Sequence, residues 1–271
     1  MHQNPCLAPV WPPPDGSYDY ILELNDSEVA WEFLRRNPDY QQDVHLHQEA
    51  LVRPRAMASG QKVWFDARRS MAAGRWGLSR FVDPASRALE APIDWMEELG
   101  AAKIDAMARE PCQGERSDVH LTELQCVRHI VVSAEGAETL LINTSDKALT
   151  LRLRGATALL GPVCLTFQIA GMRALPYSGR SILRLPDMLT GRPRKFNRSR
   201  RKLLLRDALV AIDGRQAGAT YRDVAVVVAG AESARTAWRN SDHSLKDRMR
   251  RALKSGMLLR NGRYRILIKQ K

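Results

Sequence analysis

The positive charge of this chain is concentrated in its last 80 residues. Between Arg192 and Lys271 there are 22 Lys and Arg residues against 6 Asp and Glu residues, which gives a net charge of +16. The whole chain has 42 and 30, so residues 1–191 hold 20 and 24, a net charge of −4. A mildly acidic body therefore carries a strongly basic end. This asymmetry is typical of a nucleic-acid-binding surface.

The bulk composition predicts a globular protein with free thiols. The chain has 271 residues, enough for two or three small domains. Its 44% hydrophobic and 27% charged content allows buried cores and argues against a disordered chain. Residues 1–14 lack the basic and apolar pattern of a signal peptide. The cysteines are widely spaced, form no C-x-x-C pair, and indicate a reducing compartment: Cys6, Cys112, Cys126 and Cys164.

One apolar segment needs comparison with a membrane span. Residues 155–172 contain no charged residue. A helix through them would lose a backbone hydrogen bond at Pro162, and several polar side chains lie along the segment. We expect a buried strand, a turn at Gly161-Pro162, and a second buried strand. The protein is therefore predicted to be soluble and cytoplasmic, with no membrane partner.

Residues 11–110 form the first expected domain, which is small and helical. A helix capped by Ser27 is predicted over residues 28–37, and it ends before Pro38 because the residue before a proline avoids the α conformation. A second helix is predicted over residues 39–52.

The second half of this domain has weaker signals. Residues 75–95 show no helical period and are expected to form an irregular region anchored by tryptophans. Residues 100–110 are predicted to be either a short helix or the start of a linker.

The middle of the chain, residues 119–191, is predicted to be rich in strands. Residues 149–154 alternate apolar and polar side chains, which is the period of a half-buried strand. Turn residues separate the β-prone runs and predict a small antiparallel sheet. A partly helical stretch, residues 175–189, then leads into the C-terminal part. The β-prone runs are Leu124–Val132, Glu138–Asn143, Leu149–Arg154 and Val163–Ile169.

The basic segment, residues 192–271, is predicted to be a helical domain that ends in a β-hairpin. Its helices have caps that the sequence identifies. Together with the sheet, these helices predict an α+β fold. Three helices are expected: one capped by Ser199 and stopped by Asp213-Gly214, one over Tyr221–Ala229 behind a Thr220–Asp223 capping box, and one from Ser244 to Lys254. Asn261-Gly262 is then expected to turn a hairpin into a terminal strand over residues 263–269.

The third of these helices has the pattern of a DNA-recognition helix. Apolar residues recur at helical spacing on one face, and cations lie on another. The apolar face would pack on the protein core, and the cationic face would enter a groove of DNA. The predicted buried stripe is Leu245, Met249, Ala252 and Leu253. The cations expected to contact bases or phosphates are Lys246, Arg250, Arg251 and Lys254, with Arg248 beside them. Cations expected to contact the DNA backbone precede the first helix: Arg194, Lys195, Arg198, Arg200 and Arg201.

Two features leave alternatives open. A compact helix-turn-helix uses a turn of three or four residues, but the gap over residues 230–243 is much longer. Either the turn is extended or the motif is a different one. Single-stranded nucleic acid would need a row of exposed aromatic residues, and the basic segment has only scattered ones. A solvated basic helix face without a partner is the simplest alternative.

Signals for catalysis are weak. The sequence contains no phosphate-binding glycine motif and no nucleophile elbow. The His45-Leu46-His47 pair lacks further ligands at metal-binding spacing and is predicted to be a surface feature. We therefore expect no cofactor, no metal and no enzymatic activity.

Both ends of the chain resemble known regulatory domains. The segment WEFLRRNPDY at residues 31–40, preceded by Tyr18-Asp19-Tyr20, is similar to the opening of a small N-terminal domain of proteobacterial transcriptional regulators. Residues 75–78, 83–84 and 91–95 are similar to its second half. The segment DGRQAGATYRDVA at residues 213–225 resembles the start of a domain once catalogued as of unknown function. That similarity continues at Trp238 and over residues 246–252 and 262–265.

The fusion of these two domains resembles the FseA-type excision activators of integrative and conjugative elements. The resemblance implies that the C-terminal domain is an extended-turn helix-turn-helix. Its basic side would bind promoter DNA, and its opposite side would pack on the N-terminal domain. The resemblance also implies RNA polymerase and an acidic single-domain antiactivator as partners. The N-terminal residues expected at the contact with the C-terminal domain or the antiactivator are Trp31, Phe33, Leu34 and Trp76, each of which is also a candidate for ordinary core.

Two other functions fit the sequence. The first is a DNA-binding accessory factor in plasmid partition or replication, without a role in transcription. The second is a protein-binding module of the antiactivator kind, whose basic end would meet an acidic partner. The resemblance implies that antiactivators are acidic and lack the N-terminal domain. This chain has a basic C-terminal end and an N-terminal domain, so the activator role is favoured.

Overall fold

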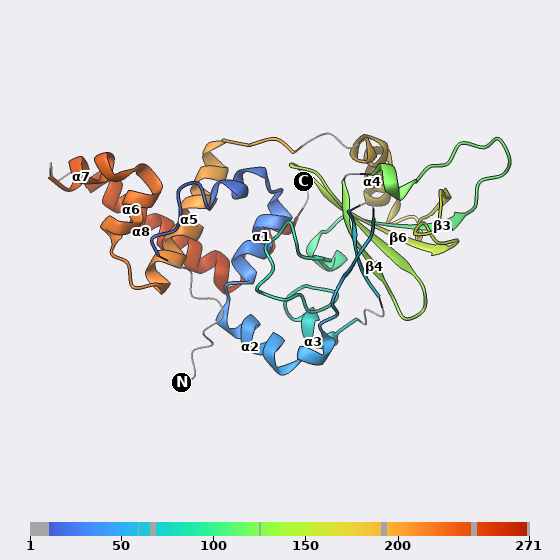
Figure 1. Cartoon of the computed structure of the whole chain (residues 1–271), viewed down its shortest axis with the longest axis horizontal. Helices are drawn as coiled ribbons and strands as arrows, with labels where there is room; N and C mark the ends of the chain where they lie inside the picture. The colour runs from blue at the N-terminus through green and yellow to red at the C-terminus, as the bar shows by residue number, and fades with distance from the viewer. Residues whose placement is uncertain are drawn as a thin grey trace.

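The computed structural model describes residues 11–58, 60–65, 69–124, 126–190, 194–239 and 243–269. The helices within residues 221–258 occupy one end of the molecule and a sheet occupies the other, with the first helices of the chain between them (Figure 1). The predicted α+β fold is confirmed.

Two short helices and a 3₁₀ turn open the N-terminal region: η2 (Asp19–Glu23), α1 (Asp26–Leu34) and α2 (Pro38–Leu46). The Asn25 side chain accepts a hydrogen bond from the Glu28 amide, and the Glu28 carboxylate accepts one from the Asn25 amide. This capping box begins α1, so the prediction that Ser27 is the cap was wrong by two residues. Asn37 caps α2, and Pro38 takes its first position, where a missing N–H costs nothing.

The rest of this region is mostly irregular, as predicted. Leu78 and Trp95 form an isolated β-bridge, and the Trp76 and Trp95 side chains are buried. α2 ends at Leu46, so the second helix is shorter than expected. The short elements are η3 (Gln48–Ala50), α3 (Met71–Gly74), η4 (Glu97–Leu99) and η5 (Leu121–Glu123).

The described residues form one mixed sheet in the order β1-β2-β4-β5-β6-β3-β7. The prediction of a small antiparallel sheet from the middle of the chain was therefore incomplete. Three strands come from residues before 110, and β2–β4 and β3–β6 are parallel pairs. The strands are β1 (Arg55–Ala56), β2 (Lys62–Trp64), β3 (Lys103–Arg109), β4 (Val127–Val132), β5 (Glu138–Asn143), β6 (Ala148–Gly155) and β7 (Cys164–Gln168).

β3 corrects the expectation of a helix or linker over residues 100–110. Its alternate residues Ile104, Ala106 and Ala108 are buried, which is the period of a strand with one face on a core. A short apolar run does not distinguish a strand from a helix, and pairing with β6 and β7 decides this one.

The uncharged segment also differs from its prediction. Residues 155–172 contain a single full strand, β7, which lies at the edge of the sheet. Cys164 at its start is buried, whereas Phe167 and the preceding Leu160 are exposed. Two buried strands are therefore not present. Among the residues that the structure describes, no helix is long and apolar enough to cross a membrane.

The described C-terminal part is helical as far as Ile268. Its elements are α4 (Leu175–Leu189), α5 (Arg200–Gln216), α6 (Tyr221–Ala229), α7 (Ala231–Arg239), α8 (His243–Leu258), η6 (Leu259–Arg263, a π-type turn) and α9 (Arg265–Ile268). Ser199 caps α5, and Thr220 and Asp223 form the capping box of α6, as predicted. The spacer after Gly230 contains a helix, α7.

The predicted terminal hairpin was wrong. Gly262, with φ of +127°, turns the chain between two helical segments rather than between strands. Tyr264, Leu267 and Ile268 are all buried. The spacing i, i+3, i+4 places these side chains on one face of a helix, whereas a strand would turn the adjacent pair to opposite faces.

The predicted helix stop at Asp213-Gly214 was also wrong, because α5 continues to Gln216. A Cβ atom on Gly214 would lie 2.7 Å from Cη2 of Trp11. Gly214 therefore allows the N-terminal segment to pack directly against α5. Its role is close packing rather than helix termination.

α5 connects two hydrophobic cores. Leu205, Ala208, Leu209 and Ile212 lie in a core with α1, α2 and α9, which we call the N-terminal core. Val210 and Ala211 lie in a core with α6, α7 and α8, which we call the helical core. A third core lies between the sheet and α4. The N-terminal core and the helical core thus lie on opposite sides of α5.

Candidate nucleic-acid interface

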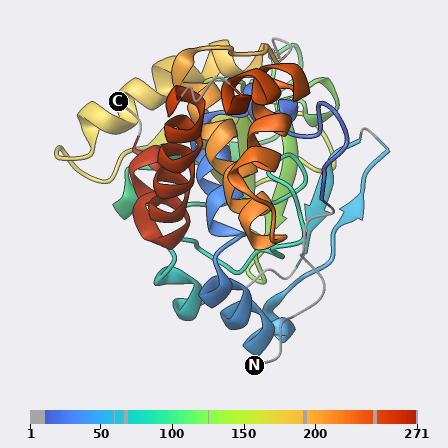
Figure 2. The same cartoon turned by 90° about the vertical axis from the view of Figure 1, so that its left-hand side faces the viewer.

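α8 lies at the helical end of the molecule, with α6 and α7 beside it (Figure 2). Met249 and Ala252 are buried in the helical core, and Leu245 and Leu253 are partly buried against it. The predicted apolar stripe is therefore confirmed. A Cβ atom on Gly256 would lie 2.8 Å from the Ala208 carbonyl oxygen, so this glycine allows α8 to approach α5 closely.

The opposite face of α8 presents cations to solvent. Arg250, Arg251 and Lys254 are exposed and Lys246 is half-buried. Arg250 forms a 3.2 Å ion pair with Asp247, and the Arg251 Nε donates to the Asp247 carbonyl oxygen. Neither Lys246 nor Lys254 forms an ion pair with a residue that the structure describes.

Arg248 has a different role. Its Nη2 lies 2.6 Å from Oδ2 of Asp207, whose side chain is 1% exposed. Arg206 contacts the other oxygen of the same carboxylate at 3.0 Å. Arg248 thus joins α8 to α5 through one side of its guanidinium, while the side chain remains 41% exposed, and its predicted DNA contact stays a prediction.

The basic run before α5 divides into two groups. Lys195, Arg198 and Arg200 are exposed and form no ion pair with the residues described. Arg194 is 9% exposed and forms a bidentate pair with Glu28, at 2.6 and 2.7 Å. Arg201 is exposed but pairs with Asp26 at the start of α1. The expectation that Arg194 contacts the DNA backbone was therefore wrong.

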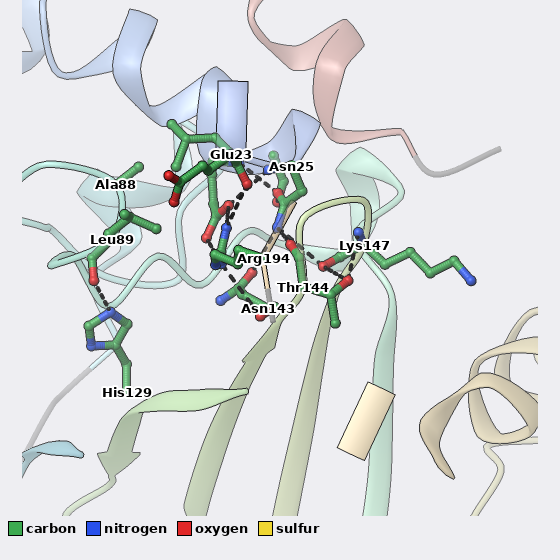
Figure 3. A network of polar contacts seen from close by, with 12 residues as sticks. Glu23, Asn25, Ala88, Leu89, His129, Asn143, Thr144, Lys147 and Arg194 are labelled. Carbon is green, nitrogen blue, oxygen red and sulfur yellow. Dashed lines mark hydrogen bonds and ion pairs between the residues drawn. The ribbon is translucent and has the colours of Figure 1, made fainter. Parts of the chain in front are cut away.

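Arg194 belongs to a polar network between α1 and the sheet (Figure 3). It donates to Glu28 and to the Glu23 carbonyl oxygen. The side-chain nitrogen of Asn25, Nδ2, donates to the carbonyl oxygens of Thr144 and Lys147, in the turn between β5 and β6. The capping residues of α1 therefore also fasten it to the sheet.

A second buried network joins α1 to α5. The Arg36 guanidinium contacts Asp213 at 2.8 Å and Glu32 at 2.6 Å, and the Tyr18 hydroxyl donates to Asp213. Burial, together with the adjacent Asp213 carboxylate, raises the pKa of Tyr18 well above its usual range. The sequence contained no signal for this network, because its members are separated by up to 195 residues.

Buried ionisable groups are concentrated in these contacts. Burial alone would raise the pKa of Glu32, but the charges of Arg35 and Arg36 and their hydrogen bonds lower that pKa to about 2. Burial lowers the pKa of Lys202, and the nearby Asp26 carboxylate partly offsets this effect. Lys202 also donates to the Leu24 carbonyl oxygen at 2.6 Å. These perturbed groups hold elements together rather than line a reaction site.

The N-terminal apolar residues expected at a protein contact are in the core. Trp31, Phe33 and Leu34 are fully buried, and Trp76 is 9% exposed. The Trp31 indole donates to the Ser86 carbonyl oxygen, and the Trp76 indole donates to Asp43. These four side chains share the N-terminal core with residues of α5 and α9, and they present little surface to another protein.

The described residues contain no cluster of three or more His, Cys, Asp or Glu side chains suited to a metal ion. His45 is exposed, and the His47 ring stacks on Phe81 at 5.1 Å. His129 is buried, and one ring nitrogen lies 3.0 Å from the Leu89 carbonyl oxygen (Figure 3).

Comparisons with known proteins agree with this geometry. Residues 169–269, which include α4 to α9, match the RovC-type family model described as a T6SS transcription factor DNA-binding domain. Residues 13–81 match a proteobacterial transcriptional regulator-like domain. No curated protein matches the chain. The two domain matches support a DNA-binding regulator.

Proposed function

We propose that this protein is a transcriptional activator that binds double-stranded DNA through the exposed face of α8. The observation that carries the proposal is the division of α8 into a buried apolar stripe and an exposed cationic face, within the segment that matches a transcription factor DNA-binding domain. Arg250 and Arg251 are suited to guanine edges or phosphates, and Lys246 and Lys254 to phosphates.

The elements around α8 fit an extended helix-turn-helix. α6 and α8 both pack in the helical core, and α7 occupies the spacer that is too long for a compact turn. Lys195, Arg198 and Arg200 are exposed and are proposed to contact the DNA backbone away from α8. The protein would act by binding rather than by catalysis, in the cytoplasm where bacterial DNA lies.

The resemblance of both chain ends to FseA-type activators supports a role in excision or transfer of a mobile genetic element. In that role RNA polymerase is a proposed partner. An acidic antiactivator would have to replace α5 against α1, and so break the contact between Arg36 and Asp213. The RovC-type match suggests T6SS genes as the alternative target. A promoter–reporter panel that covers both gene sets separates these targets, and DNA binding without any change in transcript favours a partition or replication factor.

The DNA-binding proposal is tested by removing charge from α8. Footprinting on the neighbouring genomic DNA supplies the site, and fluorescence anisotropy over a salt series measures affinity. If about six phosphates are neutralised, the affinity falls roughly 10³-fold between 50 and 200 mM salt. Arg250→Ala with Arg251→Ala should lower affinity about 10- to 100-fold and reduce the salt slope by about 1.8, since each phosphate contact contributes about 0.9.

The matched control removes the same charge elsewhere. Arg116 and Arg154 are exposed cations. Arg154 lies in β6 and Arg116 follows β3, and both strands are at the other end of the molecule from α8 (Figure 1). Arg116→Ala with Arg154→Ala should leave both affinity and salt slope unchanged. Equal losses in the two double variants would mean that net charge, rather than the α8 face, determines binding, and no loss in either would refute the proposal.

A further inference from the structure

A cationic cleft lies away from α8, where elements of different cores meet. The starts of α1 and α5, the turn between β5 and β6, the middle of α4 and the end of α9 surround a volume of about 430 Å³. Clefts of about 300–1,000 Å³ at such junctions are the usual size and position of small-molecule sites. The proposed DNA-binding face on α8 contributes no residue to this cleft.

Cations from four separate elements line the cleft: Lys147, Arg184, Arg201 and Lys269. Arg201 is paired with Asp26, but the other three form no ion pair with the residues that the structure describes. Lys147 extends away from the Asn25 network that its own carbonyl oxygen joins (Figure 3).

The two acidic side chains in the cleft are already engaged. Asp26 contacts Arg201 and Lys202, and Asp146 accepts a hydrogen bond from the Thr144 hydroxyl at 2.9 Å. Four cations and two carboxylates leave the lining with a formal net charge of +2. Unpaired cations brought together from distant parts of a chain repel one another, so an anion of matching charge would stabilise this arrangement.

The remaining wall is apolar. Ile266 of α9 is 61% exposed and lines the cleft beside Leu267, Ile268 and Ala148. This side would accept the uncharged portion of a ligand, while the cations meet its anionic group. A phosphate monoester carries a charge of about −1.5 to −2 at pH 7, which matches the lining.

We propose that this cleft binds a small organic phosphate monoester, with Lys147, Arg184 and Lys269 around the phosphate and Ile266 against the apolar portion. Because the ligand would contact α1, α4 and α9 together, it would brace the junction between the N-terminal core and the sheet. Binding there is a function separate from DNA recognition, and the two can fail independently.

Fluorescence titration of the full chain with methylanthraniloyl-labelled AMP, and competition with AMP, tests the proposal. We expect a Kd below about 1 mM for AMP, and at least about 10-fold weaker competition by adenosine. Lys147→Ala with Arg184→Ala should weaken AMP binding by about 10-fold or more, because neither side chain has a partner among the described residues. Thermal denaturation of each variant confirms folding.

Arg250→Ala with Arg251→Ala is the matched control, since it removes two cations from the same chain. This variant should lose DNA affinity and keep AMP affinity, and the cleft variant should do the reverse. The proposal is wrong if the wild-type chain does not bind AMP at about 1 mM, or if the cleft variant binds it as well as wild type. Loss of DNA affinity in the cleft variant with unchanged AMP binding would instead assign the cleft to the DNA backbone.

Discussion

The cations of the basic C-terminal segment differ in where they point. Arg194, Lys202 and Arg206 face inward and contact the acidic side chains of the N-terminal region. Arg250, Arg251 and Lys254 on α8 face solvent. The first group holds the two parts of the chain together, whereas the second faces outward, where an anionic partner can reach it. A high density of cations in a sequence can therefore have two structural meanings: some cations form ion pairs inside the molecule, and others form a charged surface.

The largest expected effect concerns the inward contact at Asp213. Asp213→Ala leaves the buried Arg36 guanidinium with fewer partners, so the free energy of unfolding should fall by about 3–5 kcal/mol. Urea denaturation measures the change. Asp247→Ala, which removes an exposed carboxylate from α8, should change the free energy by less than about 0.5 kcal/mol. A loss below about 1 kcal/mol for Asp213→Ala would show that the contact does not fasten α5 to α1.

The second expected effect is a pH dependence from Glu32 on the inward side. Its pKa is lowered to about 2 in the folded chain, so its stabilising contribution is complete above the unfolded value of 4.5 and is lost as the pH falls toward 2. The shift corresponds to about 3 kcal/mol. Denaturation curves at pH 6, 4 and 3 compare wild type with Glu32→Gln. We expect the difference in stability between the two proteins to shrink as the pH falls, and a constant difference would contradict the assigned ion pairs.

The smallest expected effect on stability belongs to the outward cations. Lys254→Ala should change the free energy of unfolding by less than about 0.5 kcal/mol, because the side chain is exposed and unpaired within the described residues. The same substitution should reduce the salt slope of DNA binding by about 0.9. Lys62→Ala, a half-buried lysine of the sheet, is the control for the salt slope. An unchanged slope for Lys254→Ala would remove this residue from the proposed interface.

Local signals predicted the caps and the apolar stripe of the C-terminal helices but not all of their ends, since α8 runs to Leu258 rather than ending at Lys254. The caps at Ser199 and Thr220 and the apolar stripe at Met249 and Ala252 were read correctly, because each depends on residues within one or two turns. The terminal segment was misread as a strand because Arg263–Lys269 alternates in sequence. Its buried side chains follow helical spacing instead, and their packing against α1 and Trp95 selects the helix.

The candidate interface was predictable only in part. The pattern on α8 gave the exposed cations Arg250, Arg251 and Lys254, but it also gave Arg248, whose partner Asp207 lies 41 residues away. The sequence likewise assigned Arg194 to DNA, because its actual partner, Glu28, is 166 residues away in the chain and no local pattern reveals it. A single sequence shows which residues are charged, and contacts across such separations depend on how the helices pack.

The sequence by itself determined the fold class, the caps of α5 and α6 and the location of the positive charge, because these follow from propensities and periods that act over a few residues. Tertiary structure decided which cations are neutralised. Folding places α5 between two cores, so that one side of the basic segment meets the carboxylates of α1 and the other remains in water. It also brought β3 into the sheet and Trp11 onto Gly214. The physical reason is that a buried charge requires a partner, and only the folded chain determines where that partner lies.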